Sequence, residues 1–304
     1  MSSFPAELIE NILEHAYGEY KPLEKPVILH QCAQVCRTWR TIAQSLIFSE
    51  LLLSIGNPQI KILQENDSPR HLVRRVWVRI VEMEIIPWML GPRSAFDLTR
   101  LTTLRTSDRT NHLEGYALVQ ELVEQCASTV QDLMVDPPTM YAVLNPDLSP
   151  ECVLNPTKLS SLRTIRIAII QEMEDYTNFI PWLIALFSSF AVDSKLEEIL
   201  LPCVFPEHSL DVETGAKEDT IGEYGWEALD DLLSTSIQTL KRVVISVYGN
   251  YGVNPQGDHS LGIQFRTAFP RLTERGMLEI MGSLEPGCVS SEDCWWRLVD
   301  KANS

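Results

Sequence analysis

Few residues of this chain combine types and spacings that could carry out chemistry. Asp258, His259 and Ser260 have the residue types of a hydrolytic triad, but they are adjacent in a glycine-rich loop, whereas a triad is assembled in space from separate positions. The carboxylate pairs Asp230-Asp231 and Glu197-Glu198 are expected on helix or strand-flanking surfaces, where solvation explains them. The motifs GxGxxG, GxxxxGK[ST], HExxH and GxSxG are all missing from the sequence. We therefore expect a protein that is not an enzyme.

The cysteines and histidines give no pattern of a metal or cofactor site. There are seven cysteines, an odd number, with no CxxC pair, and no histidine sits at ligand spacing beside a cysteine. Free buried thiols in a reducing compartment are the expected state. We expect no metal and no cofactor.

The charge balance restricts the classes of partner. The formal net charge is -16 and the pI about 4.8, so most of the surface should repel nucleic acid phosphates. The arginines between residues 70 and 109 are interleaved with acids, which favours a solvated face of mixed charge. No signal-peptide pattern opens the chain, and the longest apolar run, Phe179 to Val192, is too short to span a bilayer about 30 Å thick. The sequence thus predicts neither a nucleic-acid nor a membrane partner, and a cytoplasmic or nuclear location, or both.

Two helices are expected in the first fifty residues. Pro5 suits the first turn of a helix that runs to about residue 16, with its apolar residues at helical spacing. A second amphipathic helix is predicted over residues 28 to 46, after a loop that contains Pro22 and Pro26. Helices this short do not bury enough surface to be stable alone, so they must pack on the rest of the chain or on a partner.

The N-terminal pattern resembles an F-box. The resemblance rests on Phe4-Pro5-x-Glu7-Leu8-Ile9-x-x-Ile12-Leu13, Val35-Cys36-Arg37-x-Trp39 and Leu46-Ile47-Phe48, and covers residues 4 to 53. Phe4 replaces the usual leucine, and the loop from Tyr17 to Val27 is longer than in compact members. The resemblance implies binding to a Skp-type adaptor and, through it, to a cullin. The implied docking face and the small core behind it include Pro5, Leu8, Ile9, Ile12, Leu13, Val35, Cys36 and Trp39. Alternatively, the segment is an ordinary helical hairpin packed on the following domain.

A weak repeat follows residue 54. Its template is an apolar residue, two others, an apolar residue, one other and an apolar residue, and its last three positions alternate as a half-buried strand does. The matches begin at Val73, Val130, Leu162, Leu196 and Leu240, with a partial match at Leu101. Helices are expected between these strands, over Leu113 to Cys126, Thr177 to Phe190, a stretch through Trp226 to Leu233 behind a capping box at Thr220 and Glu223, and a last one through Trp295 to Val299.

The expected fold class is α+β, with an N-terminal all-helical F-box (residues 1–53) followed by an irregular α/β solenoid (residues 54–304) that resembles leucine-rich repeats. An α/β globular domain whose strands share the pattern is the alternative. The implied function is that of a non-catalytic substrate-recognition subunit of a Skp–cullin–F-box (SCF) ubiquitin ligase, which brings an unknown protein substrate to the ligase. Two alternatives stay open: an α/β repeat scaffold that binds proteins without a ligase role, and an enzyme of unrecognised type.

Overall fold

The computed structural model describes residues 12–13, 29, 31–35, 37–53, 72–79, 85–91, 97–107, 113–135, 156–167, 169–170, 179–190, 194–205, 225–249 and 265–282. The chain divides into two compact units, residues 1–109 and 110–304. The domain boundary after residue 53, which follows from the F-box resemblance, stays a prediction.

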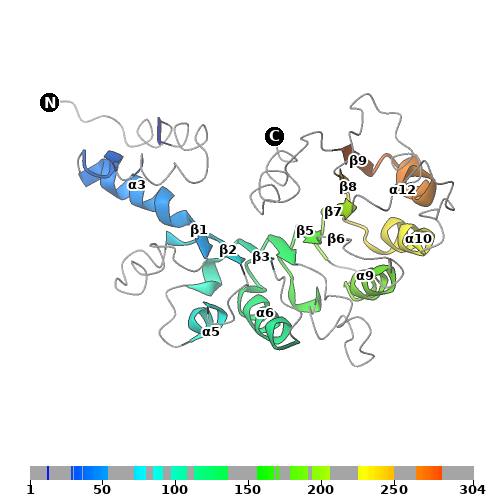
Figure 1. Ribbon diagram of the computed structural model, residues 1–304, viewed down its shortest axis with the longest axis horizontal. Coiled ribbons are helices and arrows are strands. Elements are labelled where there is room, and N and C mark those ends of the chain that lie inside the picture. Colours follow the sequence, from blue (N-terminus) through cyan, green and yellow to red (C-terminus); the bar gives the residue numbers. More distant parts are fainter. Residues whose placement is uncertain are drawn as a thin grey trace. The chain divides into compact units, whose positions relative to one another are not determined.

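The first unit contains a parallel sheet. Its described elements are helix α3 (Arg37–Ser49), strands β1 (Glu50–Leu53) and β2 (Arg75–Arg79), helix α5 (Ile85–Leu90), the 3-10 helix η2 (Leu98–Arg100) and strand β3 (Thr103–Ser107) (Figure 1). The strands pair in the order β1, β2, β3, with Leu51 opposite Val76 and Val76 opposite Leu104. All three of these side chains are fully buried, so an apolar row crosses the sheet and fixes its register.

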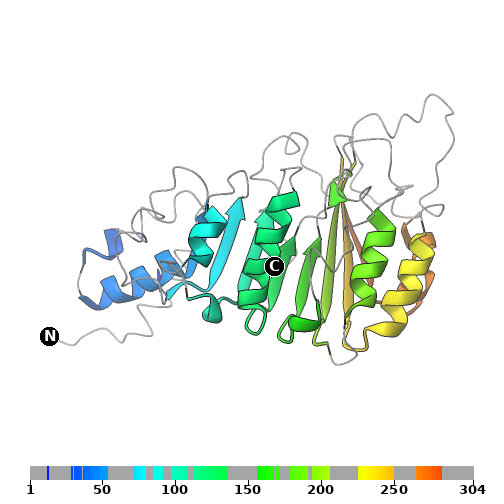
Figure 2. The same ribbon diagram turned by 90° about the horizontal axis from the view of Figure 1, so that it is seen from below.

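The second unit repeats the alternation of strand and helix. Its elements are α6 (Leu113–Cys126), β4 (Asp132–Val135), η3 (Pro156–Lys158), β5 (Thr164–Ile167), β6 (Ile169–Ile170), α9 (Phe179–Ser188), β7 (Glu198–Phe205), α10 (Trp226–Ser236), β8 (Arg242–Gly249), α12 (Pro270–Glu274) and β9 (Leu278–Gly282). The strands pair in parallel in the order β4, β5, β7, β8, β9, and β6 also pairs with β7. Within this unit, α6, α9, α10 and α12 lie on one side of the strands (Figure 1), and the strands run side by side (Figure 2).

The strands begin with a backbone arrangement that recurs along the chain. The amides of Glu197 and Glu198 both donate to the carbonyl of Arg163, at 2.8 and 3.0 Å. The amides of Lys241 and Arg242 in turn donate to the carbonyl of Glu197, at 2.8 and 3.2 Å. Residues 163–164 do the same to the carbonyl at 131, and residues 102–103 to the carbonyl at 74. Strands β3, β5, β7 and β8 are therefore each aligned at the amino end on the strand with which they pair.

The strands predicted from the repeat template are confirmed. Strands β2, β3, β4, β5, β7 and β8 each contain the last two positions of one match. The leading position of each match precedes its strand and is buried with them: Val73, Leu101, Val130, Leu162, Leu196 and Leu240. The template identifies strands because its last two apolar positions are two residues apart. They therefore point to the same face of the sheet, which is buried.

The predicted fold class is wrong. All described strand pairs are parallel, and helices lie between most of the successive strands, so the class is α/β and not α+β. The first 53 residues are not all helical, because β1 lies within them and pairs with β2. The structure thus replaces the predicted all-helical F-box followed by a leucine-rich-repeat-like solenoid with an α/β arrangement. Strand β1 was missed because Leu51, Leu52 and Leu53 form a continuous apolar run, which has no alternation to identify it.

The helix predictions are confirmed in part. Helices α6 and α9 lie where they were expected. The predicted helix over residues 28–46 is interrupted by a turn at residues 33–35, and α3 continues to Ser49. The N-cap of α10 is Gly225, at φ 84°, rather than the predicted capping box, whose residues lie outside the described ranges, as does the expected helix through Trp295. Glycine suits Gly225 because other residues rarely adopt this left-handed conformation.

Candidate functional site

The apolar residues of the docking segment, the part of the chain that resembles an F-box (residues 4–53), differ in exposure. Ile12 is 43% exposed and Val35 is 64% exposed, whereas Leu13 is buried at 1% and Trp39 is half-buried. Among the residues whose side chains the structure describes, Ile12 and Val35 are the large apolar residues that are exposed. Pro5, Leu8, Ile9 and Cys36, which the resemblance also implied, lie outside the described residues.

Backbone hydrogen bonds and one side chain hold Val35 in place. The amide of Val35 donates to the carbonyl of Cys32 at 3.1 Å, which closes the turn before α3. The guanidinium Nε of Arg40, on α3, donates to the carbonyl of Ala33 at 3.1 Å. The exposed Val35 therefore lies in a turn that is hydrogen-bonded to α3.

Other apolar side chains of the same segment are buried. Leu29, Ala43 and Phe48 are buried together with Leu13. In an amphipathic segment the buried apolar residues stabilise the fold, and apolar residues at the same spacing can also lie exposed to solvent. The periodicity of the sequence could not separate the two roles, because both sets share helical spacing.

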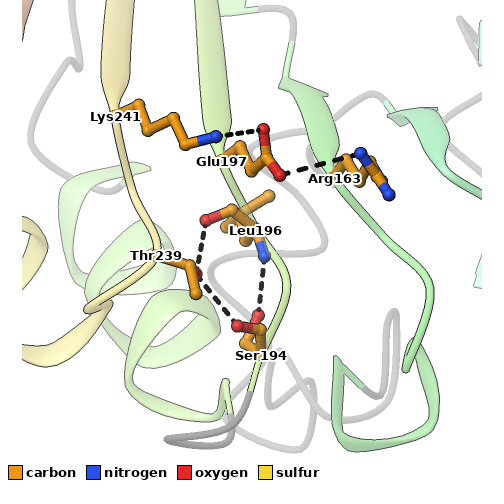
Figure 3. A network of polar contacts seen from close by, with 6 residues as sticks. All are labelled: Arg163, Ser194, Leu196, Glu197, Thr239 and Lys241. Carbon is orange, nitrogen blue, oxygen red and sulfur yellow. Dashed lines mark hydrogen bonds and ion pairs between the residues drawn. The ribbon is translucent and has the colours of Figure 1, made fainter.

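Charged side chains join neighbouring strands at their amino ends in the second unit (Figure 3). Glu197 accepts from the Nζ of Lys241 at 2.8 Å and lies 3.8 Å from a guanidinium nitrogen of Arg163. The hydrogen bond from Lys241 lowers the pKa of Glu197. Close by, the hydroxyl of Thr239 donates to the carbonyls of Ser194 and Leu196, at 2.9 and 2.8 Å (Figure 3). These contacts join the starts of successive strands to one another.

Three further ion pairs lie on the strands. Arg166, on β5, donates to both carboxylate oxygens of Asp132 on β4, at 2.9 and 3.2 Å, and its side chain is only 3% exposed. Arg242, on β8, contacts Glu198 of β7 at 2.8 Å and Glu279 of β9 at 2.7 Å. Burial acts to lower the pKa of Arg242, but the hydrogen bonds and charges of Glu279 and Glu198 outweigh it and raise that pKa.

Asp230 is a buried carboxylate, so the prediction that it lies on the surface is wrong. It is fully buried on α10, and its two oxygens accept from the amides of Arg271 and Leu272, at 2.8 and 3.0 Å. These are amides of the first turn of α12, which have no partner within their own helix. The neighbouring Asp231 forms an ion pair with Arg271 at 2.8 Å. No local signal marks Asp230, because its partners lie about forty residues further along the chain.

The described residues contain no candidate metal site. No group of three histidine, cysteine or acidic side chains could hold a metal within the described ranges. Asp258, His259 and Ser260 lie outside them. Burial raises the pKa of the Cys126 thiol to about 12, so this cysteine carries no nucleophilic thiolate at neutral pH.

Within the described part of the chain, none of the helices combines the length and apolar character needed to cross a lipid bilayer. No protein-family model matches the sequence, and no curated protein matches it either.

Proposed function

We propose that the chain is a substrate-recognition subunit of an SCF-type ubiquitin ligase, which docks a Skp-type adaptor through its N-terminal segment and contributes no catalytic group. The observation that carries the proposal is the exposure of Ile12 and Val35 in the segment that resembles an F-box. Single exposed apolar residues are common on proteins. Here, however, both exposed large apolar side chains of the described residues lie in the one segment where the sequence pattern implies a partner.

The adaptor would link the chain to a cullin, and the remaining sheet and loops would hold a target protein. Such a subunit acts by proximity, because holding the target near the conjugating enzyme raises its effective concentration. The proposed location is the cytoplasm, the nucleus or both, where the ligase and reduced cysteines occur together.

The test is co-expression of the full chain with a Skp-type adaptor. Ile12→Asp and Val35→Asp each place a charge in the proposed interface, and each should weaken the complex by about tenfold or more. Both side chains are exposed, so the variants should retain the far-ultraviolet circular dichroism and the unfolding temperature of the wild type. Ala228→Asp is the matched control, because it adds the same charge at an exposed position in the second unit.

If both aspartate variants form the complex as well as the wild type does, the proposal is wrong. A wild-type chain that binds no adaptor would remove it as well. The recurring backbone arrangement of the strands would then favour a protein-binding scaffold of repeated α/β elements without a ligase role. Pull-down with the full chain separates the two functions, because only the first brings cullin peptides with it.

A further inference from the structure

Helix α3 passes directly into the sheet of the first unit. Ser49 is the last helical residue and Glu50 is the first residue of β1, with no linker between them. The helix to which the turn at Val35 is fastened is therefore continuous with a strand. Because no linker separates them, α3 and β1 restrict each other's position.

Strand β1 is held by residues that are distant in sequence. Glu50 pairs with Arg75 and Leu51 with Val76, about 25 residues further along the chain. Leu51 and Val76 are fully buried, and so is Leu104 of β3, the register partner of Val76. Because parallel pairing closes a long loop, β1 keeps its place only while β2 is formed.

Near its amino end, α3 is hydrogen-bonded to the turn that contains the exposed Val35. Arg40 donates to the carbonyl of Ala33, and the amide of Val35 closes the same turn. The turn that contains Val35 is thus hydrogen-bonded to α3, and α3 runs without a break into β1, which pairs with β2.

We propose that the docking segment and the parallel sheet of the first unit form one cooperative unit, so that a protein bound at Val35 also stabilises β1 and β2. This inference rests on the proposed function for the identity of the bound protein. It differs from an F-box that folds with its adaptor as a separable module of about fifty residues. Cooperative units of this kind open and close together, and a ligand that binds the closed form lowers the population of the open form.

Amide hydrogen exchange of the full chain, with and without a Skp-type adaptor, tests the inference. Peptides that cover β1 and β2 should exchange more slowly in the complex. The exchange should slow by at most about a hundredfold when the adaptor concentration is about a hundred times its dissociation constant. Peptides that cover β8, in the second unit, serve as the reference. Slower exchange that stops at Ser49, with β1 and β2 unchanged, would overturn the inference.

A pair of matched variants tests the same coupling in the other direction. Leu51 on β1 and Leu201 on β7 are both fully buried leucines of parallel strands, in different units. Leu51→Ala should weaken adaptor binding by about fivefold or more, as expected if the binding-competent fraction falls to about one fifth. Leu201→Ala should lower the unfolding temperature and leave adaptor binding unchanged.

The outcomes separate this inference from the proposed function. If Leu51→Ala folds and binds the adaptor as tightly as the wild type, the coupling is wrong while the receptor function stands. If Leu51→Ala does not fold, exchange in the wild-type complex decides. If the wild-type chain binds no adaptor, both proposals fall.

Discussion

At the scale of single residues, Asp230 and Asp231 show how far the environments of adjacent acids can differ. Both lie on α10, but Asp230 is enclosed and accepts two amide hydrogen bonds, whereas Asp231 is half-exposed and forms an ion pair. A buried acceptor that is lost leaves its donors unsatisfied, whereas an exposed ion pair contributes little because water replaces it.

Asp230→Ala should therefore lower the free energy of unfolding by about 2–3 kcal/mol, because the first turn of α12 loses its cap inside the protein. Asp231→Ala, the matched control one position away, should lower it by less than about 1 kcal/mol. Urea unfolding followed by circular dichroism measures both. Equal losses for the two variants would show that Asp230 is not a buried cap.

Cys126 provides a prediction for pH. Its thiol donates to the carbonyls of Leu122 and Val123, and burial raises its pKa to about 12 from an ordinary value of 9.0. Between these two values the unfolded chain loses the thiol proton and the folded chain keeps it. This residue's contribution to stability is therefore complete below pH 9 and declines as pH rises toward 12.

Labelling with iodoacetamide at pH 8, followed by peptide mass spectrometry, checks the protection of this thiol. Cys126 should stay unlabelled in the native protein and react fully in urea. Cys32, a free and half-buried cysteine of the same chain, is the internal comparison and should react in the native protein. Rapid native labelling of Cys126 would contradict its burial.

At the scale of elements, strand pairs are joined by ion pairs that differ in burial. The Arg166 guanidinium on β5 is almost enclosed, and its Asp132 partner on β4 is 21% exposed. The Arg242–Glu279 pair between β8 and β9 is more open, because the Glu279 side chain is 47% exposed. Removing one member of a buried pair leaves an uncompensated charge, whereas an open pair is screened by water.

Asp132→Ala should thus lower the free energy of unfolding by about 3 kcal/mol, and Glu279→Ala by less than about 1 kcal/mol. Combining Asp132→Ala with Arg166→Met should recover part of the loss, because the buried charge is then gone. Thermal and urea unfolding of the three variants measure these differences. A double variant less stable than Asp132→Ala alone would mean that Arg166 stabilises the sheet through other contacts.

At the scale of the whole molecule, the negative charge is concentrated in one compact unit. Residues 1–109 contain 13 lysines and arginines against 12 acids, whereas residues 110–304 contain 12 against 29. The acidity that disfavours binding to nucleic acid therefore belongs to the second unit. In the proposed receptor, a partner of the first unit would meet a nearly neutral protein surface, and a partner of the second unit would meet a strongly acidic one.

Much of the strand and helix content followed from local patterns. The repeat template, whose middle apolar positions include Ile165, Ile199 and Val243, identified the strands. It did so because apolar residues must recur wherever a strand faces a helix layer. The same pattern did not give the fold class. Strand β1 has no alternation, and parallel pairing joins positions such as Glu50 and Arg75 that no local window compares.

The sequence by itself determined which segments are amphipathic and where the repeated strands lie, because both depend on the periodicity of neighbouring residues. Only the tertiary structure decided that Val35 is exposed while Leu13 is buried, and that Asp230 caps a helix. The physical reason is the same in each case. Exposure and capping depend on what packs against a residue from distant parts of the chain, and periodicity contains no information about that neighbour.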